Sequence, residues 1–496
     1  MEETQMKTRF TTSALALLLL GAMALSACGD STGTETKDTA AQADTTAAVT
    51  EEPTEEDLRK AIPDNLPEKD MAGYQFRVWT RERGDFVEDV GFDLEETGEV
   101  VDDAIYSRNR DVEERFNADL VQVIISDGTG TAAEIVKSIS SGEDTHDVAM
   151  GQVITIPKLG TEGYFLDWYT DLPHVNLEAP WYIGNAAEAL SVAGHAYAMI
   201  GEFDLDVLRF TYCMYFNKGI AANYDLENIY DVVSEGRWTH EYLRQLSTQV
   251  YTDLNGDGQK SEDDLLCISG DPYSAVVTYQ YAYNNPTYTL DKDGIPQLTL
   301  NTAKANDIVT KLNDLYWVTE GGYTQGWGTG STAWVNGNLL FYTGLFQNAN
   351  AYREVEFDFG IIPYPKYDEA QSQYYTMSDG AHGVMTVPVT LQNTEYASII
   401  IEALNAETYK QVIPAYYDVS LKVKAARDDE SVKALDLLME SRVFDFGYIY
   451  NTGSICFTIQ DLVSKNSNKS ESTYASKMKT ALKEYQKIVD AYLELE

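Results

Sequence analysis

The stretch Tyr74-Gln75-Phe76-Arg77-Val78-Trp79 decides the fold class of this chain. Apolar and polar residues alternate along it, which is the pattern of a β-strand with one buried face. Four more elements follow it: helical patterns over 99–120 and 132–139, and apolar strands over 121–125 and 147–150. Strands that alternate with helices in this way form a parallel sheet covered by helices. We therefore predict an α/β fold.

The rest of the chain predicts further helices. The clearest runs from Tyr474 to the end, with its apolar residues at helical spacing. Others are predicted over 239–250, 303–318, 395–404 and 431–439. Since a domain typically holds roughly 100–200 residues, the length of 496 residues predicts two or three domains.

Charge excludes one class of partner. The chain has 36 Lys and Arg against 79 Asp and Glu, a formal net charge of −43. Nucleic acids are repelled by such a protein, because their binding depends on basic residues that neutralise phosphate. No apolar run reaches the roughly 20 residues that span a bilayer. With 34 Tyr, 16 Phe and 7 Trp, aromatic faces favour a neutral ligand, although most of these rings are expected in the core.

The N-terminus indicates export. Lys7 and Arg9 precede a short apolar stretch over 14–25, which is typical of a signal peptide. Leu25-Ser26-Ala27-Cys28 then resembles the lipobox of bacterial lipoproteins, and this resemblance implies that Cys28 is diacylated. We predict a lipoprotein signal peptide over 1–28 and an extracytoplasmic, lipid-anchored protein. An ordinary signal peptide with an accidental cysteine is the alternative, and Met1 and Met6 both stay open as the start.

The segment over 29–60 is rich in Thr, Ala, Asp and Glu. Such a composition cannot bury enough apolar surface to offset its ordering entropy, so we predict a disordered acidic tether. The remaining cysteines are Cys213, Cys267 and Cys456. Because they are odd in number and lack a CxxC motif, we expect no disulfide framework.

Several later segments resemble the family 1 extracellular solute-binding proteins of bacterial carbohydrate ABC transporters, the maltose-binding-protein-like family. They are Leu190-Ser-Val-Ala-Gly-His-Ala-Tyr197 with Cys213-Met-Tyr-Phe-Asn-Lys218, Gly236-Arg-Trp-Thr239, Phe357-Asp-Phe-Gly-Ile-Ile-Pro-Tyr-Pro-Lys366, Pro414-Ala-Tyr-Tyr417 and Phe444-Asp-Phe-Gly447. In this order they cover nearly all of 73–496. The resemblance implies a periplasmic-binding-protein-like type II fold, in which two α/β lobes are joined by a hinge and the ligand cleft lies between them.

The same resemblance implies the domain boundaries and the partners. The N-terminal lobe would comprise 61–212 and about 380–430, and the C-terminal lobe about 217–375 and about 431–496. A carbohydrate would bind in the cleft and stabilise the closed state through contacts from both lobes. The permease subunits of an ABC transporter would be the partners of a monomeric receptor, and no catalysis is implied.

Candidate ligand contacts follow from the rule that ligands of α/β sheets bind at the carboxyl ends of strands. With the family as a guide, they are Arg81, Gln152, Phe203, Asp204, Trp327, Phe346 and Asp379. The alternatives are a solvated charge for Arg81, core packing for Phe346 and a loop plug for Trp327. By contrast, Trp238 is expected in the core and Thr239 at the N-cap of a helix.

An acidic loop over 253–264 fits the calcium-binding pattern D-x-[DN]-x-[DN]-G-x5-[E/D]. The predicted ligands are Asp253, Asn255, Asp257, the carbonyl of Gln259, and Asp264. Gly258 permits the sharp turn, while Asp264 stands where an EF-hand has the longer Glu. We predict one structural Ca²⁺; an acidic turn without a metal is the alternative.

Catalytic motifs are missing from the sequence. It has no G-x-S-x-G, S-x-x-K, H-E-x-x-H or P-loop motif, and its 5 His are scattered. We therefore predict a non-enzymatic, substrate-binding protein that captures a sugar or oligosaccharide for an ABC importer. Two alternatives stay open: a receptor for an oligopeptide or another small solute, and a surface glycan hydrolase, because carboxylate pairs are too common here to exclude a catalytic dyad.

Overall fold

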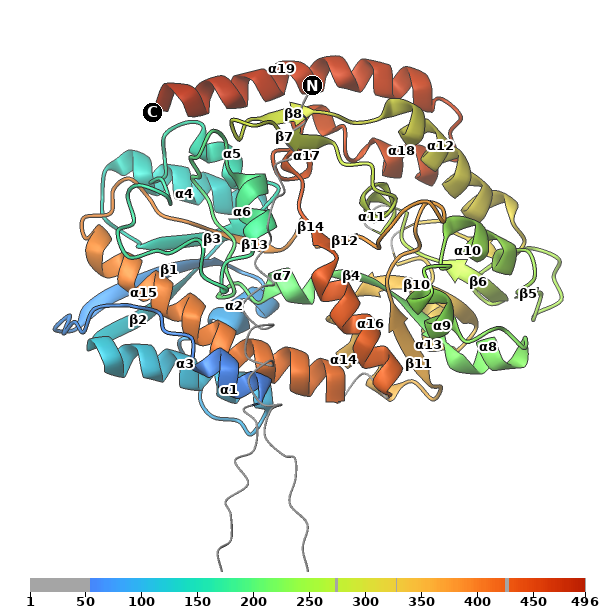
Figure 1. The fold of residues 1–496 in the computed structure, drawn as a ribbon, viewed down its shortest axis with the longest axis horizontal. Helices are drawn as coiled ribbons and strands as arrows, with labels where there is room; N and C mark the ends of the chain where they lie inside the picture. The colour runs from blue at the N-terminus through green and yellow to red at the C-terminus, as the bar shows by residue number, and fades with distance from the viewer. Residues whose placement is uncertain (1–53, 273–274, 327, 424–427, 496) are drawn as a thin grey trace, which may run out of the picture. The chain divides into compact units, whose positions relative to one another are not determined.

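The structure is a computed structural model that describes residues 54–272, 275–326, 328–423 and 428–495. Contacts group Pro53–Glu496 into one compact unit (Figure 1). The predicted signal peptide, Cys28 and most of the predicted tether lie outside the described residues. Within the described part of the chain, no helix is both long and apolar enough to cross a bilayer.

The first sheet confirms the predicted parallel α/β pattern. Its strands lie in the order β13-β3-β1-β2, and β1 pairs in parallel with both β2 and β3. The strands are β1 (Tyr74–Arg81), β2 (Ala118–Ile125), β3 (Val148–Gln152) and β13 (Gly383–Thr386). The accompanying helices are α1 (Glu55–Lys60), α2 (Gly84–Val90), α3 (Val100–Phe116), α4 (Thr129–Ser141), α5 (Pro157–Gly160), α6 (Gly184–Leu190), α7 (Asp206–Arg209) and α15 (Thr394–Glu407). We call this part the first half.

The second sheet has the order β11-β4-β10-β6-β5, with β9 beside β6. Its strands are β4 (Tyr212–Asn217), β5 (Tyr251–Thr252), β6 (Leu265–Ser269), β9 (Gly322–Tyr323), β10 (Leu339–Leu345) and β11 (Phe359–Ile362). The helices of this second half are α8 (Lys218–Asn223), α9 (Ile229–Ser234), α10 (His240–Ser247), α11 (Val277–Ala282), α12 (Thr302–Asn313), α13 (Ser331–Val335), α14 (Asn348–Ala351), α16 (Asp429–Glu440) and α18 (Thr458–Ser464).

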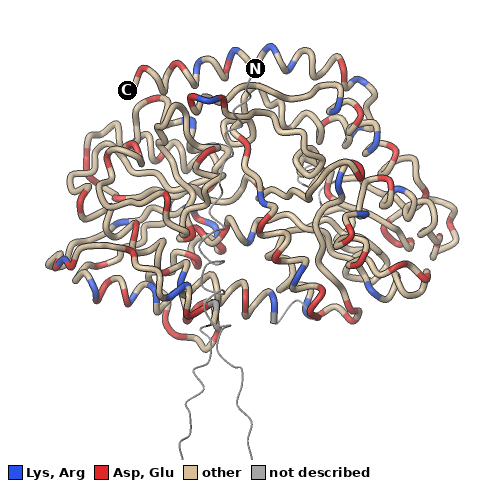
Figure 2. Tube along the Cα trace, viewed as in Figure 1, with Lys and Arg blue, Asp and Glu red and all other residues tan. Residues whose placement is uncertain are grey.

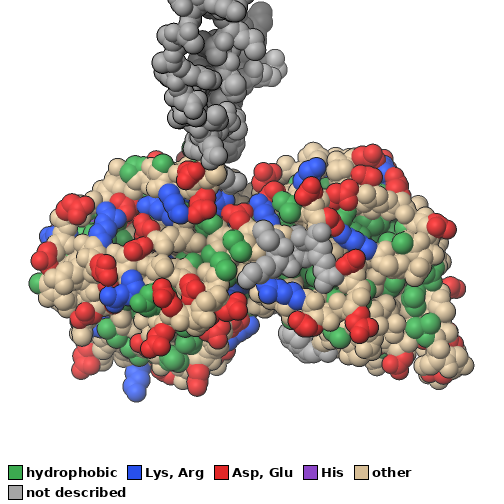
Figure 3. Space-filling view, turned by 90° about the horizontal axis from the view of Figure 1, so that it is seen from below, with side chains coloured by type: hydrophobic (Ala, Val, Ile, Leu, Met, Phe, Trp, Pro, Cys, Tyr) green, Lys and Arg blue, Asp and Glu red, His purple; other side chains and the backbone are tan. Residues whose placement is uncertain are grey.

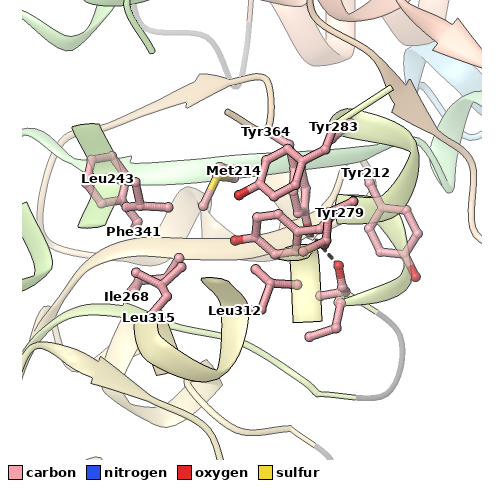
Figure 4. Close-up of a cluster of buried hydrophobic side chains, with 14 of the residues drawn as sticks. Tyr212, Met214, Leu243, Ile268, Tyr279, Tyr283, Leu312, Leu315, Phe341 and Tyr364 are labelled. Carbon is pink, nitrogen blue, oxygen red and sulfur yellow. Dashed lines mark hydrogen bonds between the residues drawn. The ribbon is translucent and has the colours of Figure 1, made fainter. Parts of the chain in front are cut away.

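Aromatic residues dominate the core of the second half. Tyr279 packs against Tyr283 and Tyr364, with ring centroids 5.4 Å and 4.9 Å apart (Figure 4). Trp238 is fully buried and Thr239 accepts a hydrogen bond from the backbone N–H of Tyr242, which confirms both assignments. Many of the 34 Tyr therefore serve packing rather than ligand contact.

In the described part of the chain, three segments cross between the halves. The first is α7, which leads into β4. The second runs from β12 (Thr376–Met377), which pairs with β14 (Arg442–Val443), back to β13. The third is a π-helical stretch over Thr408–Val412 and Pro414–Val423 that follows α15 and precedes α16 in the chain.

Elements after β14 contact both halves. They are α17 (Phe446–Ile449), which packs on α6, and α19 (Ser470–Leu495), while a hairpin of β7 (Tyr288–Leu290) and β8 (Pro296–Leu298) lies near them (Figure 1). In α19, Tyr474 and Ala481 join the core of the second half, whereas Tyr485 and Tyr492 join a cluster of the first half. The predicted boundaries place α19 wholly in the C-terminal lobe, but the helix packs on both halves.

Three predicted boundaries need correction. The disordered tether was predicted to reach about residue 60, but α1 begins at Glu55 because Thr54 and Asp57 form a capping box. The helix predicted over 99–120 ends at Phe116, where Asn117 takes a left-handed conformation and β2 follows. The helix predicted over 303–318 is α-helical only to Asn313 and continues as a π-helix over Asp314–Val318.

Acidic residues are spread over both halves (Figure 2). On one face, Lys and Arg lie among the Asp and Glu rather than in a basic patch of their own (Figure 3). The described cysteines Cys213, Cys267 and Cys456 are buried and free, as expected.

Candidate binding site

The carboxyl ends of β1 and β3 meet the segment over 379–383, which leads into β13. Arg81, the last residue of β1, donates a hydrogen bond from Nη2 to the carbonyl of Ala381. Gln152, the last residue of β3, pairs with Gly383, and the N–H of Val153 donates to the carbonyl of His382 at 3.0 Å. We call residues 379–383 the junction segment, because strand ends of the first sheet converge on it.

Arg81 is fully buried, so it is not the solvated charge that was one alternative. Its Nη1 lies 3.3 Å from Oδ1 of Asp127, and its guanidinium carbon lies 3.4 Å from the centre of the Phe86 ring. Burial lowers the pKa of Arg81, and the charge of Asp127 opposes this effect. Its Nε has no hydrogen-bond partner among the described residues, although buried polar atoms are normally paired.

Asp204 approaches the junction segment from the loop before α7. A side chain at Gly383 would place its Cβ 2.1 Å from Oδ2 of Asp204, so the Asp204 carboxyl or the backbone would have to shift. Burial, and next the charge of Asp89, raise the pKa of Asp204 to about 8. Asp206 is buried beside them and its pKa is also raised, chiefly by burial, while Arg209 pairs with Asp89 at 2.7 Å.

Asp379 begins the junction segment and is half-buried. Its Oδ1 accepts from the N–H of Ala381 at 2.8 Å, and its Oδ2 accepts from the hydroxyl of Tyr212. The N–H of Gly380 donates to the hydroxyl of Tyr448 at 2.8 Å. Residues of the first sheet, of β4 and of α17 therefore meet at this segment.

A small cavity of about 10 Å³ lies beside the junction segment, roughly the space of one water molecule. Its walls include Tyr281, Ser378, His382, Phe444, Asp445 and Tyr448. Burial lowers the pKa of His382 to about 4, so its ring is neutral at pH 7. Hydroxyl, carboxylate, imidazole and aromatic groups thus surround one position that has room for about one water molecule.

A larger cavity of about 290 Å³ shares Val443 and Phe444 with the small one. It lies between α6, the β7–β8 hairpin and the segment that joins β14 to α17. Residues of the first half and of the elements that contact both halves therefore line it together.

Four of the seven predicted contacts gather at the junction segment: Arg81, Gln152, Asp204 and Asp379. Phe203 and Phe346 lie instead in hydrophobic clusters, with exposed fractions of 1% and 0%. Phe203 stacks on Phe92, and Phe346 packs in the cluster below α7 and β10. As ligand contacts, Phe203 and Phe346 stay predictions, and Trp327 lies outside the described residues.

Sequence reasoning missed Tyr281, His382, Phe444 and Tyr448. The stretch from Phe444 was noticed only as part of the family resemblance, and His382 was one of five scattered His. The signal that could have found His382 is its place three residues after Asp379, at the start of a strand that returns to the first sheet.

The predicted calcium loop joins β5 to β6. Asp253 accepts from the N–H of Gly258 at 2.9 Å. Asp264 is fully buried, and its two oxygens accept from the N–H groups of Leu254 and Ser261 at 3.3 Å and 2.9 Å. Among the described residues, no three or more Asp, Glu, His or Cys side chains lie together in the arrangement of a metal site. The calcium set stays a prediction: Asp253, Asn255, Asp257, Gln259 and Asp264.

No known protein family matches the sequence. No curated protein matches it either. Solved structures do match: an ABC substrate-binding protein from Listeria monocytogenes in complex with cycloalternan is 12% identical, with a TM-score of 0.52, covering 82% of this chain and 99% of that one. This chain has a substrate-binding-protein fold. The predicted periplasmic-binding-protein-like fold class is thereby confirmed.

Two further structures share the substrate-binding-protein fold. The galacto-N-biose/lacto-N-biose I-binding protein of an ABC transporter from Bifidobacterium longum, in complex with lacto-N-biose, is 12% identical with a TM-score of 0.55; 85% of this chain and 99% of that one are covered. A cyclo/maltodextrin-binding protein complexed with maltotetraose is 13% identical with a TM-score of 0.54, and the match covers 83% and 96%. All three are described as binding proteins.

Proposed function

We propose that this protein is an extracytoplasmic receptor that captures a sugar or oligosaccharide for an ABC importer and releases it uncleaved. The observation that carries the proposal is the substrate-binding-protein fold, which is shared with carbohydrate-binding structures over 82–85% of this chain and 96–99% of theirs. The polar and aromatic groups at the junction segment support it.

The chemistry of the junction segment suits a saccharide. Gln152 and Asp379 are half-buried and offer amide and carboxylate groups to sugar hydroxyls. The rings of Phe444 and Tyr448 offer apolar faces. These residues come from the first half, from a crossing segment and from the elements after β14 that contact both halves. A ligand held by all of them would therefore favour the closed arrangement.

A binding experiment tests the proposal. The purified protein is screened by thermal shift and calorimetry against maltose, maltotetraose, lacto-N-biose and cycloalternan, and each saccharide is examined afterwards by chromatography. We expect at least one to raise the melting temperature and to be recovered intact. Gln152→Ala should weaken its binding by about tenfold, the effect of about 1.4 kcal/mol, whereas the exposed control Gln249→Ala should not.

Two other outcomes would replace the proposal. Binding of a tripeptide or tetrapeptide with no response to any saccharide would make the protein an oligopeptide receptor. A saccharide recovered as shorter products, in amounts that grow with time, would make it a glycan hydrolase.

The lipid anchor and the partners belong to the same proposal. Cys28 in the lipobox would carry the acyl chains, so Cys28→Ser should move the protein from the membrane fraction to the medium. The permease subunits of an importer are the proposed partners of a monomer, and light scattering of the acyl-free protein at one chain per particle would support the monomer.

One structural Ca²⁺ in the acidic loop also stays part of the proposal, with oxygens of Asp253, Asn255 and Asp257 as its first ligands. The loop fits a hard cation in its donor types, because all its candidate ligands are oxygens. We expect EDTA to lower the melting temperature of the wild type but not that of Asp257→Ala. If EDTA leaves the melting temperature of the wild type unchanged, the proposed Ca²⁺ site is wrong.

A further inference from the structure

The β7–β8 hairpin starts and ends in the second half but reaches the first half (Figure 1). In the chain it lies between α11 and α12, which both belong to the second half. Its residues Tyr288, Ile295 and Leu298 nevertheless pack with a hydrophobic cluster that includes Leu190 and Val192 of the first half. The hairpin therefore connects the two halves without being one of the crossing segments.

The base of the hairpin is firmly anchored. The carboxylate of Asp445, which caps the N-terminus of α17, accepts hydrogen bonds from the N–H groups of Thr287 at 2.8 Å and of Tyr288 at 3.1 Å. The hydroxyl of Tyr288 also hydrogen-bonds to that of Thr452 at 2.8 Å. A Cβ at Gly447 would lie 2.4 Å from Oγ1 of Thr287, so α17 packs directly on the base. The base therefore moves together with α17.

The tip of the hairpin is well ordered in itself but weakly attached to the first half. Oδ1 of Asp291 accepts from the N–H groups of Asp293 at 2.9 Å and of Ile295 at 3.1 Å, which holds the turn together. Among the described residues, one hydrogen bond joins this turn to the first half: the N–H of Ala193 donates to the carbonyl of Gly294 at 3.1 Å. Such a bond contributes little net stability, because water replaces it when it opens.

The middle of the hairpin adds little to this attachment. It spans the cavity of about 290 Å³ that lies between the hairpin and α6. Thr289 and Leu290 line this cavity and are both exposed. Segments with few buried apolar contacts are the parts of a protein that open locally at the lowest cost in free energy. The structure therefore combines an anchored base with a tip that can detach.

We propose that the β7–β8 hairpin is a strap between the two halves, which resists their opening and detaches at its tip from the turn over 192–195 when they open. The tip detaches rather than the base, because the base is held by Asp445 and α17. The strap goes beyond the proposed function, and its tests need no ligand.

Hydrogen exchange at two neighbouring amides tests the detachment. The N–H of Ala193 donates to the strap, whereas the N–H of Val192 donates to the carbonyl of His195 in its own turn, at 3.0 Å. In the full chain, after correction for intrinsic rates, we expect the Ala193 amide to exchange at least about tenfold faster than the Val192 amide, because only the first is released with the tip. Equal rates would show that the tip does not detach by itself and would overturn the proposal.

Removal of the tip tests whether the strap holds the halves together. In this variant Asn-Gly replaces Thr289–Gln297, so a two-residue turn joins the paired residues Tyr288 and Leu298 and the base is kept. Spin labels at Lys137→Cys of α4 and Gln245→Cys of α10, both exposed positions, report the distance between the halves by double electron–electron resonance. We expect longer distances in the variant than in the wild type. An unchanged distance distribution would overturn the proposal.

Two point variants keep the test independent of how well the shortened hairpin folds. Ile295→Ser keeps the whole hairpin and weakens only the apolar contact of its tip, so exchange at Ala193 should rise by about threefold to tenfold while exchange at Val192 stays unchanged. Lys292→Ala in the same turn, where the side chain is 87% exposed, is the matched control and should change neither rate. An unchanged Ala193 rate in Ile295→Ser would contradict the strap.

Discussion

The residues gathered at the junction segment and those of the acidic loop were both predicted as ligand contacts, and the two regions are built in opposite ways. The junction segment joins Arg81, Gln152, Asp204 and Asp379, which lie up to 298 positions apart in the sequence, and most of their polar atoms are buried. In the acidic loop the predicted ligands lie within one run of 12 residues, and most of them are exposed.

The two regions also satisfy their polar groups differently. In the acidic loop, carboxylates accept hydrogen bonds from backbone N–H groups of the same loop, as Asp253 does from Gly258. At the junction segment, Nε of Arg81 and Oδ2 of Asp204 have no partner among the described residues. The acidic loop, whose residues are close in sequence, is therefore stabilised by hydrogen bonds within the loop. The junction segment brings together residues that are far apart in sequence, so its geometry depends on the whole fold.

Replacement of the cationic side chain in each region, Arg81 or Lys260, should give the largest difference in the free energy of unfolding. Arg81→Met takes away the donor to the Ala381 carbonyl and the positive charge near Asp204, so we expect a loss of about 3 kcal/mol in the free energy of unfolding. Lys260→Met in the acidic loop removes a hydrogen bond from Nζ to the carbonyl of Thr319 and should cost about 1 kcal/mol. Urea unfolding of the two variants measures both losses in the free energy of unfolding. Similar losses would contradict the expectation that the junction segment depends more strongly on its buried cation than the acidic loop does on Lys260.

Substitution of a glycine by alanine in each region should give the second-largest difference in the free energy of unfolding. In Gly383→Ala the new Cβ meets the buried carboxylate of Asp204, so we expect a loss of about 2 kcal/mol and weaker saccharide binding. In the acidic loop, Gly258 has φ of 74° and no atom within 4 Å of a Cβ, so Gly258→Ala should cost about 1 kcal/mol through backbone strain alone. Unfolding curves of the two variants, with saccharide titrations, check this; binding lost in Gly258→Ala would contradict it.

The dependence of the free energy of unfolding on pH should also differ between the junction segment and the acidic loop. With a pKa of about 8, the Asp204 carboxyl keeps its proton in the folded protein at a pH at which the unfolded chain has lost it. The free energy of unfolding should therefore fall as pH rises between about 4 and 8, by up to about 1.4 kcal/mol per pH unit. Between pH 7 and 8 the buried His382, with a pKa of about 4, stays neutral and does not contribute.

Urea unfolding at pH 7.0, 7.5 and 8.0 separates this contribution. We expect Asp204→Asn to have a shallower slope than the wild type. Asp263→Asn at an exposed position of the acidic loop is the control and should keep the wild-type slope. A wild-type slope in Asp204→Asn would show that another group releases the proton.

A single hydroxyl should give the smallest effect. Tyr212→Phe removes the hydrogen bond to Oδ2 of Asp379 and should cost about 1 kcal/mol, because that bond is partly buried. Tyr224→Phe next to the acidic loop removes an exposed hydroxyl pair with Thr252 at 3.2 Å and should cost less than about 0.5 kcal/mol. Thermal unfolding of both variants measures the difference, and equal costs would argue against a special role for the Tyr212 bond.

Much of the fold could be predicted because periodicity is local. Alternation from Tyr74 and the helical pattern from Tyr474 gave β1 and α19, whose positions the structure confirms. The misplaced helix end near residue 117 had a readable signal, since Asn is common at left-handed helix ends. The π-helix over Asp314–Val318 had none, because its apolar residues continue the pattern of α12.

The site was harder to predict because burial is a tertiary property. Phe203 and Phe346 were predicted as contacts from their places in loops, and the loops gave no sign that both rings pack in hydrophobic clusters. Arg81 was placed correctly at a strand end, but its full burial depends on Phe86 and Ala381, which lie on other segments. Only the register of β13 on β3 brings Gln152 to the junction segment.

The long C-terminal helix has a mechanical consequence. At 26 residues and about 1.5 Å per residue, α19 is a rod of about 39 Å that is anchored at one end by Tyr474 and at the other by Tyr492. Because a rigid helix packs on both halves, the halves cannot move apart while both of its ends stay in contact. Either the halves rotate about the axis of α19, or one end of α19 loses its contacts. Hydrogen exchange along α19, with and without a bound saccharide, distinguishes these motions. Uniform protection of its amides indicates rotation about the helix, and exchange confined to one end indicates that this end loses its contacts.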